Sequence, residues 1–164
     1  MRLRRRCLSR GGLLSAVSLA LLAAPLPSRS EVLYSLQTQC SIKGATAVPC
    51  TVEAVDGDGV TLYRHRIGSR TETIRISDKP IRMSRWDGSS NTWRSISRAS
   101  AQFSTNTVCF NGRDLCVVNP NYLNSVREDN AAAMTGRDVV KVNFGADGRI
   151  NASCYDDGCG VNLQ

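Results

Sequence analysis

Nine positively charged side chains between positions 60 and 100 are the residues best suited to binding chemistry. The same segment has three acidic residues, so its formal charge is +6, and eight of the nine cations are arginine. The planar guanidinium of arginine binds carboxylates, sulfates and phosphates through paired hydrogen bonds. Two tryptophans in the segment could stack on a sugar, a base or a guanidinium. The candidate binding residues are Arg64, Arg66, Arg75, Arg82, Trp86 and Trp93.

The competing interpretation of this segment is a solvated sheet face. Residues 31–59 carry a formal charge of −3 and residues 101–164 carry −2. These acids could neutralise the arginines by pairing with them, and the sum from residue 31 onward is only +1. The sequence leaves both interpretations open.

His65 is the only histidine, so any mechanism with a histidine general base depends on it. A two-residue turn at Gly68-Ser69 would place His65 opposite Glu72, and this Glu-His pair near a serine would suit a small hydrolase. No Gly-x-Ser-x-Gly sequence or other nucleophile motif accompanies it. We therefore favour an ordinary cross-strand pair, and we assign no catalytic residue and no cofactor.

Six cysteines follow position 30, and an even number in an exported chain predicts three disulfides. They form three couples with nine, six and four intervening residues, so we favour pairing within each couple: Cys40 with Cys50, Cys109 with Cys116, and Cys154 with Cys159. Sequence alone permits other pairings. Zinc is the alternative, but structural zinc sites favour two to four intervening residues. We predict no metal site and interpret the acids at Asp156 and Asp157 as part of a stapled turn.

The candidate binding residues fall on a run of predicted hairpins. Residues 60–67 and 71–77 alternate as two strands about Gly68-Ser69, which suits a type II′ turn. That register puts Tyr63, Ile67, Ile74 and Ile76 on one face and Arg64, Arg66, Arg75, Thr71 and Thr73 on the other. The alternation continues with Ile81, Met83 and Arg85 on one side and Arg82, Ser84 and Trp86 on the other.

The remaining elements complete a mostly β (α+β) domain at residues 31–164. Strands are predicted at 31–39, 52–55, 92–96, 139–144 and 149–154, with a hairpin about Asn111-Gly112 inside the Cys109–Cys116 couple. On the last two strands Val140, Val142, Phe144, Ile150 and Ala152 would point inward. Asn119-Pro120 predicts one short helix over 120–129, followed by a helical turn or loop. We expect a small antiparallel sheet or a partly open barrel of hairpins, stapled by three disulfides.

Residues 1–30 have the pattern of a cleavable signal peptide. Arginines crowd the first ten positions, and residues 13–26 contain no charge. A bilayer span needs about 20 apolar residues, so this 14-residue run predicts no permanent membrane span. Ser28 and Ser30 supply the small residues for cleavage before Glu31. We expect an exported protein, either periplasmic or extracellular.

Removing the signal peptide removes most of the apparent basicity. Six of the 21 lysines and arginines precede Glu31, whereas all 14 acids follow it. The high isoelectric point is therefore no argument for nucleic-acid binding. Our first hypothesis is a non-catalytic binding module that contacts an anionic envelope polymer or protein. The alternatives are a small envelope hydrolase that uses His65 and a structural component of the cell envelope.

Overall fold

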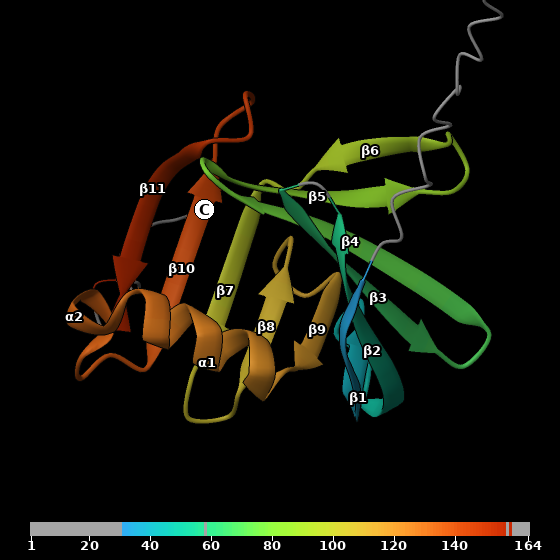
Figure 1. Cartoon of the computed structure of the whole chain (residues 1–164), viewed down its shortest axis with the longest axis horizontal. Coiled ribbons are helices and arrows are strands. Elements are labelled where there is room, and N and C mark those ends of the chain that lie inside the picture. Colours follow the sequence, from blue (N-terminus) through green and yellow to red (C-terminus); the bar gives the residue numbers. More distant parts are fainter. Residues whose placement is uncertain (1–30, 58, 157, 159–164) are drawn as a thin grey trace, which may run out of the picture.

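The computed structural model describes residues 31–57, 59–156 and 158 (Figure 1). The predicted signal peptide at residues 1–30 lies outside this part of the chain. Nearly all of the domain predicted at residues 31–164 is covered. Within the described ranges, no helix is both long enough and apolar enough to cross a membrane.

The described chain is mostly β, as the alternation of its side chains predicts. Eleven strands form one sheet in the order β11-β10-β7-β8-β9-β1-β2-β3-β4-β5-β6, and each neighbouring pair is antiparallel. The elements are β1 (Val32–Ile42), β2 (Val48–Gly57), β3 (Val60–Ile67), β4 (Arg70–Asp78), β5 (Ile81–Asp87), β6 (Thr92–Ser95), β7 (Arg98–Gln102), β8 (Thr107–Phe110), β9 (Leu115–Val118), α1 (Pro120–Asp129), α2 (Ala131–Met134), β10 (Val139–Phe144) and β11 (Ile150–Tyr155).

The sheet curls into a half-barrel because two strands that are far apart in the sheet are consecutive in the chain. β6 is last in that order and β7 is third, yet only Ile96 and Ser97 separate them. The backbone N–H of Ile96 donates to Met83 O on β5 at 3.0 Å, and Phe144 N–H on β10 donates to Ser97 O at 2.8 Å. The two-residue link therefore brings β5 and β10 to the same bend, which a flat sheet could not do.

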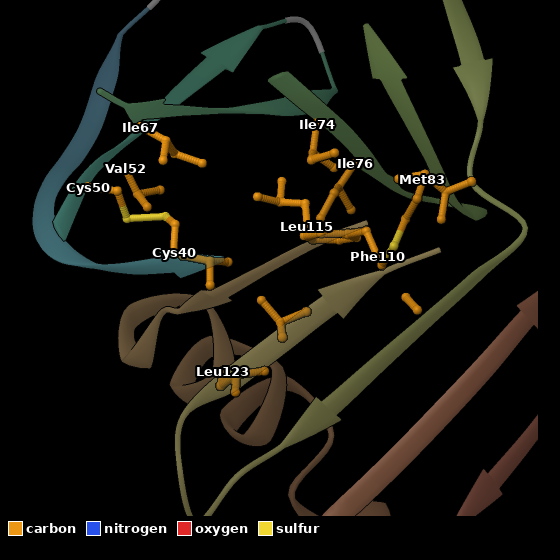
Figure 2. Close-up of a cluster of buried hydrophobic side chains, with 14 of the residues drawn as sticks. Cys40, Cys50, Val52, Ile67, Ile74, Ile76, Met83, Phe110, Leu115 and Leu123 are labelled. Atoms are coloured by element: carbon orange, nitrogen blue, oxygen red, sulfur yellow. A yellow bond between two sulfur atoms is a disulfide. The ribbon is translucent and has the colours of Figure 1, made fainter. Parts of the chain in front are cut away.

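The hydrophobic core fills the concave side of the curl (Figure 2). Val52 and Ile74 are fully buried, and Leu115 is 1% exposed. Ile76 and Met83 are paired across β4 and β5 and lie on the same side as Ile74. The inward face derived from the Gly68-Ser69 turn is thus confirmed as the core face of these strands.

Helix α1 closes one end of the curl. It follows β9 directly, so it lies at the end opposite the β8–β9 turn (Figure 1). The Asn119 side chain accepts a hydrogen bond from Tyr122 N–H, and Pro120 occupies the first turn, as predicted. Leu123 is buried in the core, and the Tyr122 ring meets Tyr63 edge-on at 5.4 Å. The segment expected to be a helical turn or a loop is the short helix α2, so the helical-turn alternative is confirmed.

Two of the three predicted disulfides are present. Cys40–Cys50 joins β1 to β2, with Cα atoms 5.7 Å apart. Cys109–Cys116 joins directly opposed residues of the β8–β9 hairpin, with Cα atoms 4.1 Å apart. The third predicted pair includes Cys159, which lies outside the described residues.

The final hairpin departs from the predicted alternation. Val140, Val142 and Phe144 pack against the core as expected. An irregularity between Asn143 and Phe144 shifts the register of β11, so Ala152 lies opposite Asn143 rather than opposite an inward residue. Ile150 is 44% exposed. The inward placement of Ala152 was wrong, because the extra residue puts Ala152 on the face of Asn143. Ile150 lies opposite the inward Phe144, as the expected face requires, but its side chain is exposed rather than packed in the core.

Candidate functional site

The sheet register places all six predicted binding residues on the outward face of β3 to β6. The expected pairing about Gly68-Ser69 is confirmed, with Arg66 opposite Thr71 and Arg64 opposite Thr73. Arg75 lies opposite Ser84, and Trp86 lies opposite Trp93. Side chains on one strand alternate between faces, so these outward positions are separated from the core. We call Arg64, Arg66, Arg75, Arg82, Trp86 and Trp93 the outer arginine–tryptophan face.

Two arginines of this face share one carboxylate. Glu53 on β2 lies opposite Arg64. Its Oε2 is 3.5 Å from Arg64 Nη1 and 3.4 Å from Arg66 Nη2. The Arg64 side chain is 41% exposed and the Arg66 side chain 60% exposed. Both guanidinium groups therefore remain accessible to a ligand from solvent.

The tryptophans form a compact cluster with Arg75. The Trp86 and Trp93 rings meet edge-on with centroids 5.2 Å apart. The guanidinium of Arg75 lies 4.5 Å from the centre of the Trp93 ring, and its Nε donates to Ser84 Oγ at 3.1 Å. Arg75 is thus held by an aromatic ring and a hydroxyl, and neither group neutralises its charge.

Arg82 occupies the margin of the face. It lies opposite Ser77 on β4, beyond the Arg75–Ser84 pair. Its aliphatic carbons approach Gly148 in the β10–β11 turn, where an added Cβ would lie 3.8 Å from Arg82 Cγ. The structure therefore brings Arg75, Trp86 and Trp93 into contact, groups Arg64 with Arg66, and leaves Arg82 at the edge.

A charged cavity, which the sequence analysis did not identify, opens at the end of the curl opposite α1. Its volume is about 820 Å³, and it is bordered by the β1–β2, β5–β6 and β8–β9 turns and by the start of β4. Trp86 contributes to its lining, so the cavity adjoins the outer arginine–tryptophan face. The polar side chains that line it include Lys43, Arg70, Glu72, Arg85, Asn111 and Asp114.

An ion pair between neighbouring strands forms part of the cavity lining. Arg85 Nε and Nη2 lie 3.0 and 2.9 Å from Glu72 Oε2. The Glu72 side chain is only 10% exposed, whereas the Arg85 side chain is 31% exposed. The carboxylate is therefore largely hidden, and the guanidinium faces the opening.

A second pair lies at the rim of the cavity, between Arg94 and Asp87. The Ser89 hydroxyl and backbone N–H donate hydrogen bonds to the Asp87 carboxylate and hold its pKa well below the usual range. Asp87 is therefore fully ionised at neutral pH and remains paired with Arg94.

The residues of the cavity come from segments that are far apart in the sequence, and no motif predicts that they lie together. Lys43 and Asp114 lie in separate turns 71 positions apart. The one available clue was Arg85, which alternation placed on the same side as the core residue Met83. An arginine at an inward position requires a partner or a polar opening, and this structure supplies both.

His65 lies on the core side of β3 and is 1% exposed. Its Nδ1–H donates to the backbone carbonyl of Glu72 at 3.1 Å, so the predicted cross-strand pairing is present. The Glu72 carboxylate binds Arg85 instead of the imidazole. Burial lowers the pKa of His65 to about 4, which keeps the ring neutral at physiological pH.

The described residues contain no cluster of three or more histidine, cysteine or acidic side chains that could hold a metal ion. Asp156 accepts backbone hydrogen bonds from Asp138 and Val139 at 2.8 and 3.0 Å, and Asp157 lies outside the described residues. No protein-family model, no curated protein and no solved structure matches the chain.

Proposed function

We propose that the chain is an exported, non-catalytic binding module and that its outer arginine–tryptophan face contacts an anionic polymer. The observation that carries the proposal is the charge of the outward positions paired across β2 to β6. They include four arginines and one glutamate, a net charge of +3 on one face of a domain with a total charge of only +1. Such a patch attracts anions although the whole domain is nearly neutral.

The spacing of the cations suits a polymer better than a single small ion. Arg64 and Arg66 lie two residues apart on one strand, which separates their Cα atoms by about 7 Å. Arg75 extends the array to the next strand, about 4.8 Å away. Repeated sulfate, phosphate or carboxylate groups along a chain could meet several of these arginines at once.

The aromatic cluster supports a carbohydrate polymer within that class. Trp86 and Trp93 are both half-buried, so part of each ring remains accessible beside the arginines. Sugar rings pack against aromatic faces while their acidic groups bind guanidinium, and both contacts are available here within one cluster.

The test compares two triple variants of equal charge. Heparin and lipopolysaccharide serve as probes, and binding is measured over a range of salt concentrations. Exchanging Arg64, Arg66 and Arg75 for serine should weaken binding about tenfold, because each exposed contact contributes about 0.5 kcal/mol. It should also flatten the salt dependence. The control carries serine at Arg98, Arg127 and Arg149, which lie outside the face.

Three results would contradict the proposal. The first is undetectable binding of both polysaccharides to the unmodified domain. The second is equal affinity of the two triple variants, which would mean that only total charge matters. The third is sedimentation of the domain with cell-wall material regardless of either set of substitutions, which would favour the alternative of a structural envelope component.

A further inference from the structure

We propose that the cavity at the open end of the curl is a second, separate site and that it binds a small anionic sugar, a uronate or a sugar phosphate. Its volume of about 820 Å³ lies within the range typical of small-molecule sites. The proposal concerns different residues from the outer face, apart from Trp86, which borders both regions.

The cavity lining carries four cations and three carboxylates, a net charge of +1. Glu72 is bound to Arg85, Asp87 is bound to Arg94, and Asp114 lies 4.0 Å from Arg85. Among the described residues, neither Lys43 nor Arg70 has a carboxylate within 4.0 Å of its charged group. Both side chains are exposed at the mouth. These two cations are therefore available to neutralise a carboxylate or phosphate that enters from solvent.

Arg85 and Asn111 offer further hydrogen-bond donors. Arg85 uses Nε and Nη2 on Glu72, while its Nη1 lies 4.0 Å from Asp114 Oδ2, beyond hydrogen-bond distance. Asn111 uses Oδ1 to accept from Ser97 N–H and Oγ–H at 2.9 and 3.2 Å. Within the described ranges its Nδ2 amide has no hydrogen-bond partner, so the amide is free to donate to a ligand oxygen.

The backbone holds Lys43 at the rim in an uncommon conformation. Its φ of 52° lies in the left-handed region, which costs energy for residues other than glycine. Lys43 N–H donates to Asp114 O at 3.1 Å, and Gly44 N–H donates to Arg113 O at 3.0 Å. These bonds hold the β1–β2 turn directly beside the β8–β9 turn, so Lys43 keeps its position next to Asp114 on one side of the mouth.

The remaining polar groups favour a hydroxylated ligand over a bare ion. Asp114 is half-exposed and can accept hydrogen bonds from sugar hydroxyls, and Ser95 adds a hydroxyl to the lining. Trp86 supplies one aromatic surface for a sugar ring. An acidic sugar would use the cations for its charged group and these neighbours for its hydroxyls.

The test titrates the domain with glucuronate, glucose 6-phosphate and glucose, with heat of binding and amide chemical shifts as readouts. We expect at least one of the two anions to bind and to shift the Asn111 side-chain amide, while glucose does not bind. The double variant Lys43→Ser with Arg70→Ser should lose affinity about tenfold, because two charge-assisted contacts disappear. The matched control is Arg127→Ser with Arg149→Ser, because Arg127 lies on α1 at the other end of the curl and neither residue lines the cavity.

The outcomes separate this site from the outer face. Preference for glucuronate or for the phosphate identifies which anionic group the cavity takes, and either result supports the site. Failure of both anions to bind, or equal affinity in the two double variants, would overturn it. The outer-face triple variant should retain sugar binding in the cavity, so loss of polymer binding and loss of sugar binding can be distinguished.

Discussion

The outer arginine–tryptophan face and the charged cavity are built partly from the same two strands, yet they hold their arginines differently. Arg75 points outward, where a serine hydroxyl and the Trp93 ring contact it. Arg85 lies inward at the mouth, where the nearly buried Glu72 binds two of its nitrogens. Strand alternation alone separates the two environments. The number of arginines in a segment therefore does not reveal how many are free to bind a ligand.

The two regions should also differ in what their ion pairs contribute to stability. Exposed pairs such as those of Glu53 are screened by water and salt, so each contributes little. A buried carboxylate has lost its hydration and depends on its partner, so removal of one member leaves the other uncompensated. Substitutions at Glu53 and Glu72 measure this difference directly.

The largest effect of a single substitution is expected from Glu72→Gln. The substitution removes the nearly buried carboxylate and leaves the Arg85 guanidinium, which is 31% exposed, without its charged partner, so the loss should be about 2 kcal/mol, as for a hydrogen bond to a charged group. Glu53→Gln is the matched exchange on the outer face and should cost about 0.5 kcal/mol or less. Urea unfolding of the two variants measures both values. Equal losses of unfolding free energy would show that the Glu72–Arg85 pair contributes no more to stability than the ion pairs of Glu53.

His65 makes the inner region sensitive to pH. Burial lowers its folded-state pKa to about 4 from the usual 6.5. Between these values the unfolded chain binds the proton and the folded chain does not, so stability is full above pH 6.5 and falls as pH decreases toward 4. The loss attributable to His65 is at most about 3 kcal/mol.

The measurement is the free energy of unfolding at several pH values for the unmodified domain and for His65→Asn. The variant should show a shallower decline between pH 6.5 and 4, since its side chain does not titrate. Identical slopes would assign the pH dependence to other groups. Binding of polyanions to the outer face should change little over this interval, because arginine stays charged.

The hairpin register of β3 and β4 was predictable because a two-residue turn fixes every opposed pair that follows. Met83 and Arg85 followed from the same alternation, and the helix start followed from Asn119-Pro120. The shifted register of β11 was not predictable, since the alternating pattern gives no sign of an extra residue. Nor was the cavity, because Lys43 meets Asp114 through the long-range pairing of β1 with β9, and only the curl of the sheet brings these turns to Arg70 and Arg85. Local periodicity determines the face of a side chain, whereas curvature determines which distant turns meet.

The smallest expected effect concerns Arg75 and separates packing from charge on the outer face. Arg75→Gln keeps a polar chain of similar length but removes the cation over Trp93, so the free energy of unfolding should fall by about 0.5 kcal/mol. Arg66→Gln is the control, because Arg66 has no aromatic contact among the described residues and shares Glu53 with Arg64. An equal fall in polymer affinity in both variants would show that the face binds through charge. If only Arg75→Gln then lost unfolding free energy, the contact between Arg75 and Trp93 would contribute to stability and not to binding. A larger loss of affinity in Arg75→Gln would show instead that the Arg75–Trp93 arrangement itself contacts the ligand.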